Sequence, residues 1–139
     1  MSVKVLRWGI FLTGFAIVAC YIYIKISCSL CGHNPQFGTK LSMRTIIEAL
    51  EQYYRHHHRY PSSQQGLVAL VQRPILSPIP ESYPAEGYLS RIPKDGWKND
   101  FLYLNPTQNG SYLLISFGAD GRPGGKELDA DMRSDNLEK

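Results

Sequence analysis

The sequence predicts an α+β fold, in which one amphipathic helix precedes a long loop and a small antiparallel sheet. In residues 39–59 the apolar side chains recur at steps of three and four positions, which is the period of a helix with one buried face. Residues 101–104 and 111–117 are rich in aromatic and large aliphatic side chains, and Asn109-Gly110 between them is typical of a hairpin turn. Because the helical pattern precedes the strand patterns and does not alternate with them, the strands are expected to pair locally.

The long helix is expected to end before Pro61, and three consecutive histidines, His56 to His58, fall in its last turn. Neighbouring helical positions point about 100° apart, so the three rings are not expected to converge on one metal ion. Partly cationic imidazoles instead suit the negative end of the helix dipole. We therefore interpret the histidines as a helix end.

Two further segments are expected between the helix and the hairpin. Residues 64–72 predict a short second helix, with Ser62 or Ser63 as its cap. Residues 74–96 contain five prolines and no periodic pattern, which predicts a long loop.

A membrane anchor is expected in residues 1–27. The seventeen residues from Trp8 to Ile24 carry no charge, and a helix of that length reaches about 25 Å, just enough to span a hydrocarbon core. Lys4 and Arg7 precede the apolar run, so the positive-inside rule places the N-terminus in the cytoplasm and the rest of the chain outside it. Two alternatives remain open: a cleaved signal peptide, and a lipoprotein signal whose acylated residue would be Cys20.

Residues 28–38 are expected to form a linker, because glycines and an Asn-Pro pair interrupt the apolar pattern there. Cys28 and Cys31 form a C-x-x-C motif within it. The motif is interpreted as a small disulfide or a pair of thiols close to the membrane. A redox pair and a zinc site that includes His33 are the alternatives.

Composition and motifs argue against two classes of function. The net charge is +3 and no basic tract occurs, so nucleic-acid binding is not indicated. The chain contains no nucleophile elbow, H-E-x-x-H motif, P-loop or dinucleotide fingerprint, and no cysteine after residue 31. We therefore expect a protein that is not an enzyme.

One stretch near the C-terminus has the composition of a cation site. Residues 118–132 contain five glycines or prolines and four acids. Calcium takes six to eight oxygen ligands from carboxylates and carbonyls, and glycines allow the backbone to turn its carbonyls inward. The four carboxylates that this stretch supplies belong to Asp120, Glu127, Asp129 and Asp131. On spacing alone, a solvated surface turn is the alternative.

Three stretches occur in order along the chain: RYPSSQQGLVAL (59–70), YLSRIPKDGWKNDFLYL (88–104) and SFGADGRPGGKELDADM (116–132). Together they resemble the major pseudopilin, the G-type subunit, of bacterial type II secretion. The corresponding family motifs run approximately YPTxxQGLxAL, LPxDPWGNPY and SxGADGxxGG followed by AD. The similarity covers about residues 40–132.

This resemblance implies a helical spine, a long loop, a small antiparallel sheet and a calcium ion in the C-terminal loop. By position in the motifs, Asp120 and Asp131 match the family's ligands best. Glu127 and Asp129 fall in a variable stretch and are weaker candidates, and the carbonyl of Phe117 is a candidate backbone ligand.

Four other residues matter for the same comparison. Tyr60 and Trp97 are similar to packing anchors of the family. The proline and glycine that flank the family's tryptophan are replaced here by Gly96 and Lys98, so the turn at that point is expected to differ.

The N-terminus departs from the family pattern. Pseudopilins have a G-F-T-L-x-E processing site, whereas this chain has Gly14-Phe15 followed by Ala-Ile-Val-Ala, with Ala19 at the place of the glutamate. Without that glutamate, an amino terminus buried in the membrane would have no carboxylate to pair with. Peptidase processing and ordinary filament assembly are therefore not expected to follow the family pattern.

The sequence thus predicts three parts: a membrane anchor (1–27), a linker (28–38) and a pseudopilin-like periplasmic domain (39–139). The expected location is the bacterial inner membrane, crossed once. The expected function is that of a structural or assembly component of a type II secretion or pilus-like apparatus, with a calcium-ordered loop. Its expected partners are other pseudopilins or inner-membrane components of the apparatus, and a homo-oligomer is possible. A stand-alone calcium-dependent adaptor and a thiol-redox protein working through Cys28 and Cys31 are the alternatives.

Overall fold

The computed structural model describes residues 34–105 and 111–137, which are called the body below. The described elements, in chain order, are α2 (Pro35–His57), η1 (Leu67–Leu70), β1 (Leu102–Leu104), β2 (Leu113–Ser116), η2 (Glu127–Asp129), β3 (Met132–Arg133) and η3 (Ser134–Asn136). The strands form one sheet in the order β1-β2-β3, and both pairs are antiparallel. The predicted combination of one long helix and a small antiparallel sheet is confirmed.

The expected membrane anchor, Cys20 and the C-x-x-C motif lie in residues 1–33, outside the described residues. Within the described part of the chain, no helix has both the length and the apolar character needed to cross a membrane.

Helix α2 begins four residues earlier than expected, at Pro35. The Asn34 side chain accepts hydrogen bonds from the N–H groups of Gln36 and Phe37, at 3.0 and 3.3 Å, and Pro35 occupies the first helical position. The Asn-Pro pair is thus a helix cap followed by its preferred first residue. The linker predicted over residues 28–38 is therefore wrong for its last four residues, which are helical.

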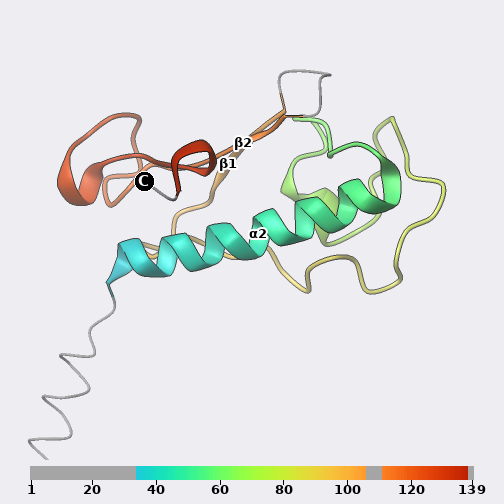
Figure 1. Ribbon diagram of the computed structural model, residues 1–139, viewed down its shortest axis with the longest axis horizontal. Helices are drawn as coiled ribbons and strands as arrows, with labels where there is room; N and C mark the ends of the chain where they lie inside the picture. Colours follow the sequence, from blue (N-terminus) through green and yellow to red (C-terminus); the bar gives the residue numbers. More distant parts are fainter. Residues whose placement is uncertain (1–33, 106–110, 138–139) are drawn as a thin grey trace, which may run out of the picture. The chain divides into compact units, whose positions relative to one another are not determined.

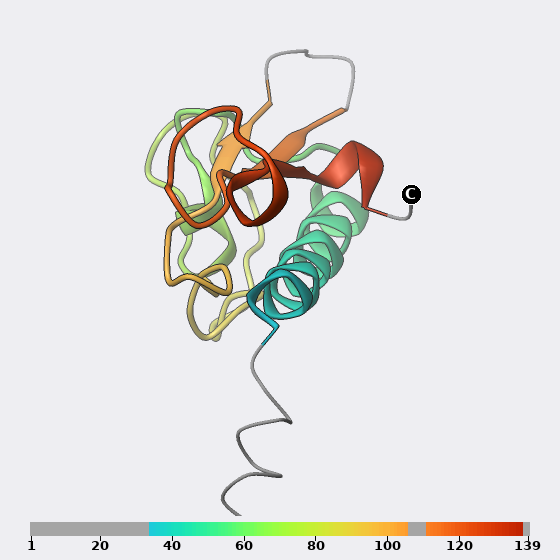
Figure 2. The same cartoon turned by 90° about the vertical axis from the view of Figure 1, so that its left-hand side faces the viewer.

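One face of α2 forms most of the hydrophobic core. Met43, Ile46, Leu50 and Tyr53 have no exposed surface, and they recur at the expected steps of three and four. The helix runs along the sheet, and the sheet and the loops cover its apolar face (Figures 1 and 2). The core is completed by residues from η1, β1, β2 and the segment before β1, namely Leu67, Ala69, Leu70, Phe101, Tyr103 and Leu114.

The end of α2 agrees with the prediction, and the histidines there have different contacts. His58 adopts the left-handed conformation and donates its N–H to the carbonyl of Tyr54. His56 Nδ1 and His57 Nε2 lie 2.9 and 2.8 Å from one atom, the hydroxyl oxygen of Tyr88. Two of the three rings thus meet at one hydroxyl group, because Tyr88 comes from a distant segment and lies between them. This contact does not test the expectation that the three rings do not converge on one metal ion.

The segment after α2 forms a shorter helix than expected. Only Leu67–Leu70 is helical, as a 3-10 turn. Ser62 Oγ accepts from the N–H of Gln65 at 3.1 Å, and Gln65 Oε1 accepts from the N–H of Ser62 at 2.9 Å. This reciprocal pair has the pattern of a capping box, but the N-cap of η1 is Gly66, which makes no side-chain cap hydrogen bond. The expectation that Ser62 or Ser63 caps this helix is therefore wrong.

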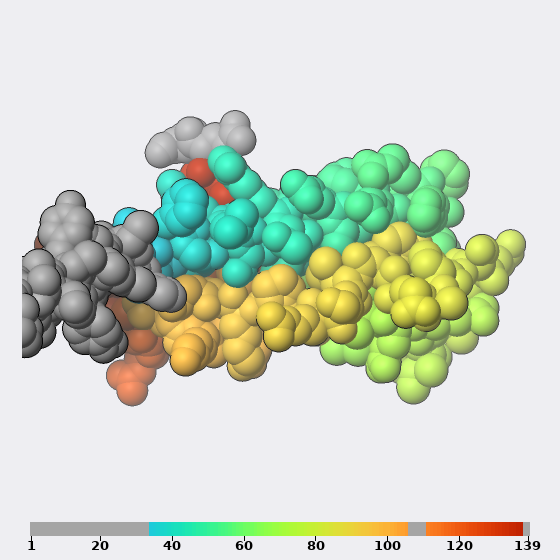
Figure 3. Space-filling view, turned by 90° about the horizontal axis from the view of Figure 1, so that it is seen from below, coloured from blue at the N-terminus to red at the C-terminus, as the bar shows by residue number. Residues whose placement is uncertain are grey.

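Residues 74–96 contain no helix or strand, as predicted, and are held against the body. Figure 3 shows the second half of this segment, in yellow, lying along α2. The N–H groups of Tyr88 and Leu89 both donate to the carbonyl of Leu70, at 2.7 and 2.9 Å. Gly87 permits this approach, because a Cβ at that position would lie 2.5 Å from the carbonyl oxygen of Val71.

The predicted hairpin is present as β1 and β2, in the register Leu102↔Ile115 to Leu104↔Leu113. The turn with Asn109-Gly110 falls outside the described residues. Strand β3 was not predicted, because two residues are too few to show an alternating pattern. It pairs with the end of β2 through Ser116↔Met132.

Candidate functional site

The predicted cation-binding stretch forms a closed excursion from the sheet, residues 117–131, which we call the glycine–acid loop. It leaves the end of β2 and returns to β3 (Figure 1). Gly118 and Gly125 both have positive φ and both press against the backbone of Asp129. A Cβ at Gly118 would lie 2.6 Å from the carbonyl carbon of Asp129, so glycine is required for the loop to close on itself.

Two hydrogen bonds attach the loop to other segments, and a third closes it on itself. Asn99 Nδ2 donates to the carbonyl of Gly118 at 3.1 Å. Within the loop, the N–H of Ala119 donates to the carbonyl of Leu128 at 2.9 Å. Gln36 Nε2, from the first turn of α2, donates to the carbonyl of Glu127 at 3.1 Å. The base of the loop is therefore fixed to both the helix and the segment before β1.

A buried carboxylate lies beneath this base. Asp95 is 5% exposed, and its Oδ1 accepts from the N–H groups of Trp97 and Asn99 at 2.9 and 2.8 Å. Its Oδ2 accepts from the hydroxyl of Ser116, the last residue of β2, at 2.7 Å. Asp95 thus joins the turn 95–99 to the strand from which the loop departs.

The predicted ligands lie at different places in the loop. Asp120 is exposed, and its Oδ1 accepts from the N–H of Arg122 at 3.0 Å. Asp131 is half-buried, and both of its carboxylate oxygens lie 3.1 Å from the N–H of Gly124 across the loop. Glu127 and Asp129 are exposed. Phe117, the candidate carbonyl ligand, is half-buried at the start of the loop.

The arrangement brings Asp131 to the loop interior but does not gather all four acids. Among the described residues, no three acids, histidines or cysteines are close enough together to hold a metal ion. The donor chemistry nevertheless suits a hard cation, because calcium accepts backbone carbonyls together with few carboxylates. Asp120, Asp131 and the carbonyl of Phe117 provide oxygen donors on one loop of flexible, glycine-rich backbone.

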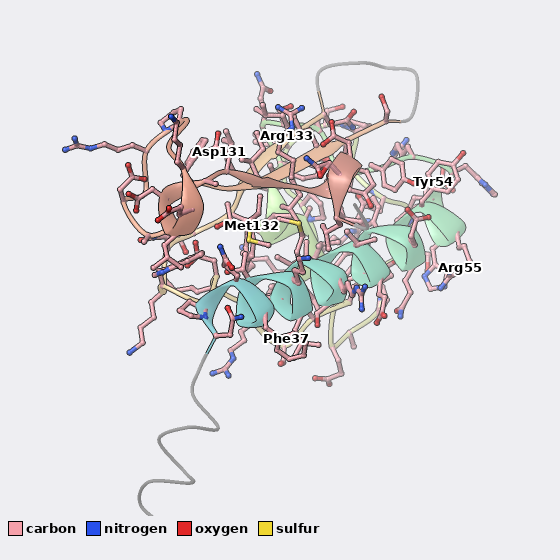
Figure 4. The ribbon with its side chains drawn as sticks, turned by 60° about the vertical axis from the view of Figure 1, so that its left-hand side comes forward. Phe37, Tyr54, Arg55, Asp131, Met132 and Arg133 are labelled. Carbon is pink, nitrogen blue, oxygen red and sulfur yellow. The ribbon has the colours of Figure 1, made fainter. Side chains whose placement is uncertain are left out.

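Asp131 also borders a hollow of about 250 Å³ between the first turn of α2 and the C-terminal segment. Lys40, Met132 and Arg133 line the same hollow. Figure 4 shows Met132 between β3 and α2, where it packs against the core. Met132, which follows Asp131 in the sequence, thus helps to hold β3 against α2.

Sequence reasoning missed the residues that support the loop. Asp95 and Asn99 lie in the stretch that resembles the family motif, but no periodicity or spacing marked them as partners of Ser116 and Gly118. Asp95 precedes the N–H groups of Trp97 and Asn99 by two and four residues. An aspartate that can accept hydrogen bonds from N–H groups shortly after it is a local turn signal. That signal alone could have identified Asp95.

Gly96 and Lys98, which flank Trp97, both have a particular backbone requirement. A Cβ at Gly96 would collide with the carbonyl of Pro35, so proline cannot replace this glycine without moving α2. Lys98 adopts the left-handed conformation at φ +73°. Tyr60 is an anchor as expected, because it stacks on Tyr54 at 4.8 Å and donates to Glu51 at 2.8 Å. Trp97 is only half-buried.

The helical spine, the small sheet and the looped base define a pseudopilin-type body, and comparisons with known proteins agree. Residues 33–135 match the family "Type II secretion system (T2SS), protein G". The chain belongs to this family, whose members are structural components of the type II secretion system and are membrane-associated and periplasm-facing.

Individual relatives show the same relationship. The chain is 45% identical over 114 residues to the type II secretion system core protein G of Pectobacterium carotovorum subsp. carotovorum, which covers 80% of this chain and 71% of the relative. It is 41% identical over 113 residues to the core protein G of Vibrio cholerae, with 79% and 77% covered. The crystal structure of the major pseudopilin from enterohaemorrhagic Escherichia coli superposes with a TM-score of 0.62 at 33% identity, covering 72% of this chain and 85% of that one.

Proposed function

We propose that this chain is a membrane-anchored pseudopilin subunit whose glycine–acid loop is ordered by calcium. The proposal is supported mainly by the way the loop is built. Its base is fixed by Asn99 and Gln36, whereas within residues 34–105 and 111–137 the hydrogen bonds to the carboxylates of Asp120 and Asp131 come from main-chain N–H groups. Such carboxylates are free to exchange a weak local contact for a cation.

Asp120 and Asp131 would be the principal ligands, together with the carbonyl of Phe117. Glu127 and Asp129 remain weaker ligand candidates. A bound ion would neutralise the carboxylates and hold the two sides of the loop together. It would therefore act on the structure of the loop, and no catalytic role is proposed.

A thermal melt of the full chain in detergent tests this proposal, with millimolar calcium, with magnesium or with chelator. Calcium at about 100 times its dissociation constant should add about 2.7 kcal/mol to the free energy of unfolding. For a body of this size the melting temperature should rise by roughly 10–20 °C.

Asp131→Ala and Asp120→Ala should each reduce or abolish the calcium shift. The matched control is Asp100→Ala, which removes an exposed carboxylate outside the loop that pairs only with Lys94, and it should keep the full shift. Equal melting temperatures with calcium and with chelator would contradict the proposal.

We further propose that residues 8–24 anchor the chain in the inner membrane and that its partners are other pseudopilins or inner-membrane components of the apparatus. The family match supports this proposal. Carbonate extraction of membranes and the intact mass of the extracted protein would test it, because together they report anchoring, cleavage and any lipid on Cys20. Release of the chain by carbonate would contradict the anchor.

One observation favours a second function, that of a stand-alone adaptor. Asn34 has extended backbone, φ −75° and ψ 103°, and caps α2, so the helix starts at Pro35. A subunit whose body has its own helix start need not enter a filament. Periplasmic cross-linking distinguishes the two functions, because a filament subunit gives a ladder of multimers and an adaptor does not.

A further inference from the structure

Residues 74–80, which we call the proline loop, expose an unusual amount of apolar surface. Ile75 is 88% exposed, and Leu76 and Ile79 are each 48% exposed. A single exposed aliphatic side chain needs no explanation, but three within five residues form a patch of the kind that binds a partner.

The main chain of the proline loop is held from inside the body. Gln65, which is 8% exposed, donates through Nε2 to the carbonyls of Leu76 and Pro78 at 2.7 and 3.0 Å. Arg73 Nη2 donates to the carbonyl of Pro80 at 2.7 Å, and Arg59 Nη2 lies 3.4 Å from the carbonyl of Pro78. The polar atoms of the loop thus face inward and its apolar side chains face outward. A surface fixed in this way loses little entropy when it binds.

A complementary feature lies at the other end of the body. Leu128 is 54% exposed in η2, between the exposed carboxylates of Glu127 and Asp129. Figure 1 shows the glycine–acid loop and the proline loop at opposite ends of α2. An apolar side chain flanked by acids at one end therefore corresponds to an apolar patch beside Arg73 and Arg59 at the other, and each end also carries one charge of the opposite sign, Lys126 beside η2 and Glu81 beside Arg73.

We propose that the proline loop of one copy docks on η2 of a second copy, with Leu128 against Ile75 and Ile79 and the acids beside Arg73. A membrane surface is a poorer occupant, because the patch lies near the end of α2 that is away from Asn34 (Figure 1), and this 23-residue helix alone is about 34 Å long. The two contacting surfaces are different, so the contact is heterologous and can repeat into an open filament. The inference rests on the proposed function, since a calcium-ordered loop would hold η2 in place.

Cysteine cross-linking of the full chain in whole cells tests this contact. The double variant Ile75→Cys/Leu128→Cys is placed in a background whose three native cysteines are replaced by serine, and the periplasm is oxidised. A head-to-tail contact should give a ladder of disulfide-linked multimers. Each single variant should give no species larger than a dimer, because one cysteine per chain cannot propagate.

Two charge substitutions provide an independent measurement. Ile75→Asp and Leu128→Asp should each lower the yield of multimers, trapped by an amine-reactive cross-linker, by roughly tenfold or more, since each removes a buried aliphatic contact. Their melting temperatures should stay unchanged because both side chains are exposed. Leu102→Asp, at an exposed position in β1 outside both surfaces, is the matched control and should keep the multimers.

The outcomes separate this inference from the proposed function. Multimers that persist in both aspartate variants, with no ladder from the double cysteine variant, would overturn the docking contact and leave the filament function standing. A chain that gives no multimers at all would overturn both. A ladder that also forms in chelator would confirm the contact and remove the role of calcium in it.

Discussion

The two ends of the body differ in the charged side chains that hydrogen-bond to the main chain, although each end also contains neutral bonds of the other kind. Gln36 and Asn99 donate to carbonyls near Asn34, and Ser62 accepts from an N–H group near His57. Near Asn34, side-chain oxygens accept from main-chain N–H groups, as Asn34, Asp95 and Asp131 do. Near His57, side chains donate to main-chain carbonyls, as Gln65 and Arg73 do. The donors at that end also include the hydroxyls of Tyr83 and Tyr103 and the amide of Asn105.

The difference follows from the composition of the loops. The loops near Asn34 are rich in glycine, whose N–H groups need acceptors when the chain turns. The segment near His57 is rich in proline, which has no N–H and therefore presents mainly carbonyls. Loop composition thus favours acceptors such as Asp95 at one end and donors such as Arg73 at the other. Charges of both signs occur at each end, so the head-to-tail contact depends on the local pairing of the acids of η2 with Arg73.

Removing the Asp95 carboxylate should have the largest effect on stability. Asp95→Ala leaves the N–H groups of Trp97 and Asn99 and the hydroxyl of Ser116 without their acceptor. Hydrogen bonds to a buried charged group are worth more than neutral ones, so we expect a loss of about 3 kcal/mol. The melting temperature should fall by on the order of 15 °C, as measured by urea and thermal unfolding.

Asp95→Asn is the control for this change. Its Oδ1 can still accept from the two N–H groups, and the Ser116 hydroxyl can rotate to accept from the amide. It should therefore recover most of the loss. A destabilisation equal to that of alanine would show that the charge matters more than the acceptor geometry.

At the His57 end, introducing a carboxylate should destabilise the body, because the side chain at position 65 donates to carbonyls. Gln65→Glu keeps the acceptor for Ser62 but places a carboxylate against the carbonyls of Leu76 and Pro78, so it should cost about 2 kcal/mol. The exposed neighbour, Gln64→Glu, makes the identical chemical change and should be neutral within about 0.5 kcal/mol. Similar free energies of unfolding for the two variants would refute the proposed donor role of Gln65.

The sequence was sufficient for the features that depend on local pattern. The amphipathic period of α2 and the Asn-Gly hairpin signal predicted the helix and the sheet, and the density of glycines and acids marked the C-terminal loop. These features are decided by residues close together in the chain.

Features that depend on distant partners could not be predicted. Strand β3 forms because Met132 can pair with Ser116 at the end of β2. The rings of His56 and His57 converge because Tyr88, more than thirty residues later, lies between them. Asp95 likewise acquires its role only when β2 brings Ser116 to it. The start of α2 is a different case, because its cap was present in the sequence and was interpreted as a break.

A smaller effect is expected from Lys98, at the Asn34 end. It occupies the left-handed region at φ +73°, where a side chain is strained and glycine is not. Lys98→Gly should therefore stabilise the body by about 0.5–1 kcal/mol, after the entropy that glycine gains in the unfolded chain is subtracted. Lys98→Asn should give an intermediate value, because asparagine tolerates this region. A loss of stability with glycine would show that the lysine side chain contributes contacts that outweigh the strain.

The smallest predicted effect is a pH dependence at the His57 end. Burial lowers the pKa of His57, and the nearby charges of His56, Arg59 and His58 lower it further. The folded body therefore binds a proton at His57 less readily than the unfolded chain does. The stabilisation is fully present above the unfolded pKa of about 6.5 and is lost as the pH falls toward the lowered folded value.

His57→Gln should remove this part of the slope when the free energy of unfolding is compared between about pH 7.5 and pH 5.5. Glutamine can still hydrogen-bond to Tyr88, so a loss of slope would reflect the proton and not the lost contact. His58→Asn is the control, because it removes an exposed imidazole at a left-handed position that asparagine tolerates. Most of the slope should remain in this variant, since burial of His57 is the main cause of its lowered pKa. An equal slope in wild type and His57→Gln would place the pH dependence elsewhere.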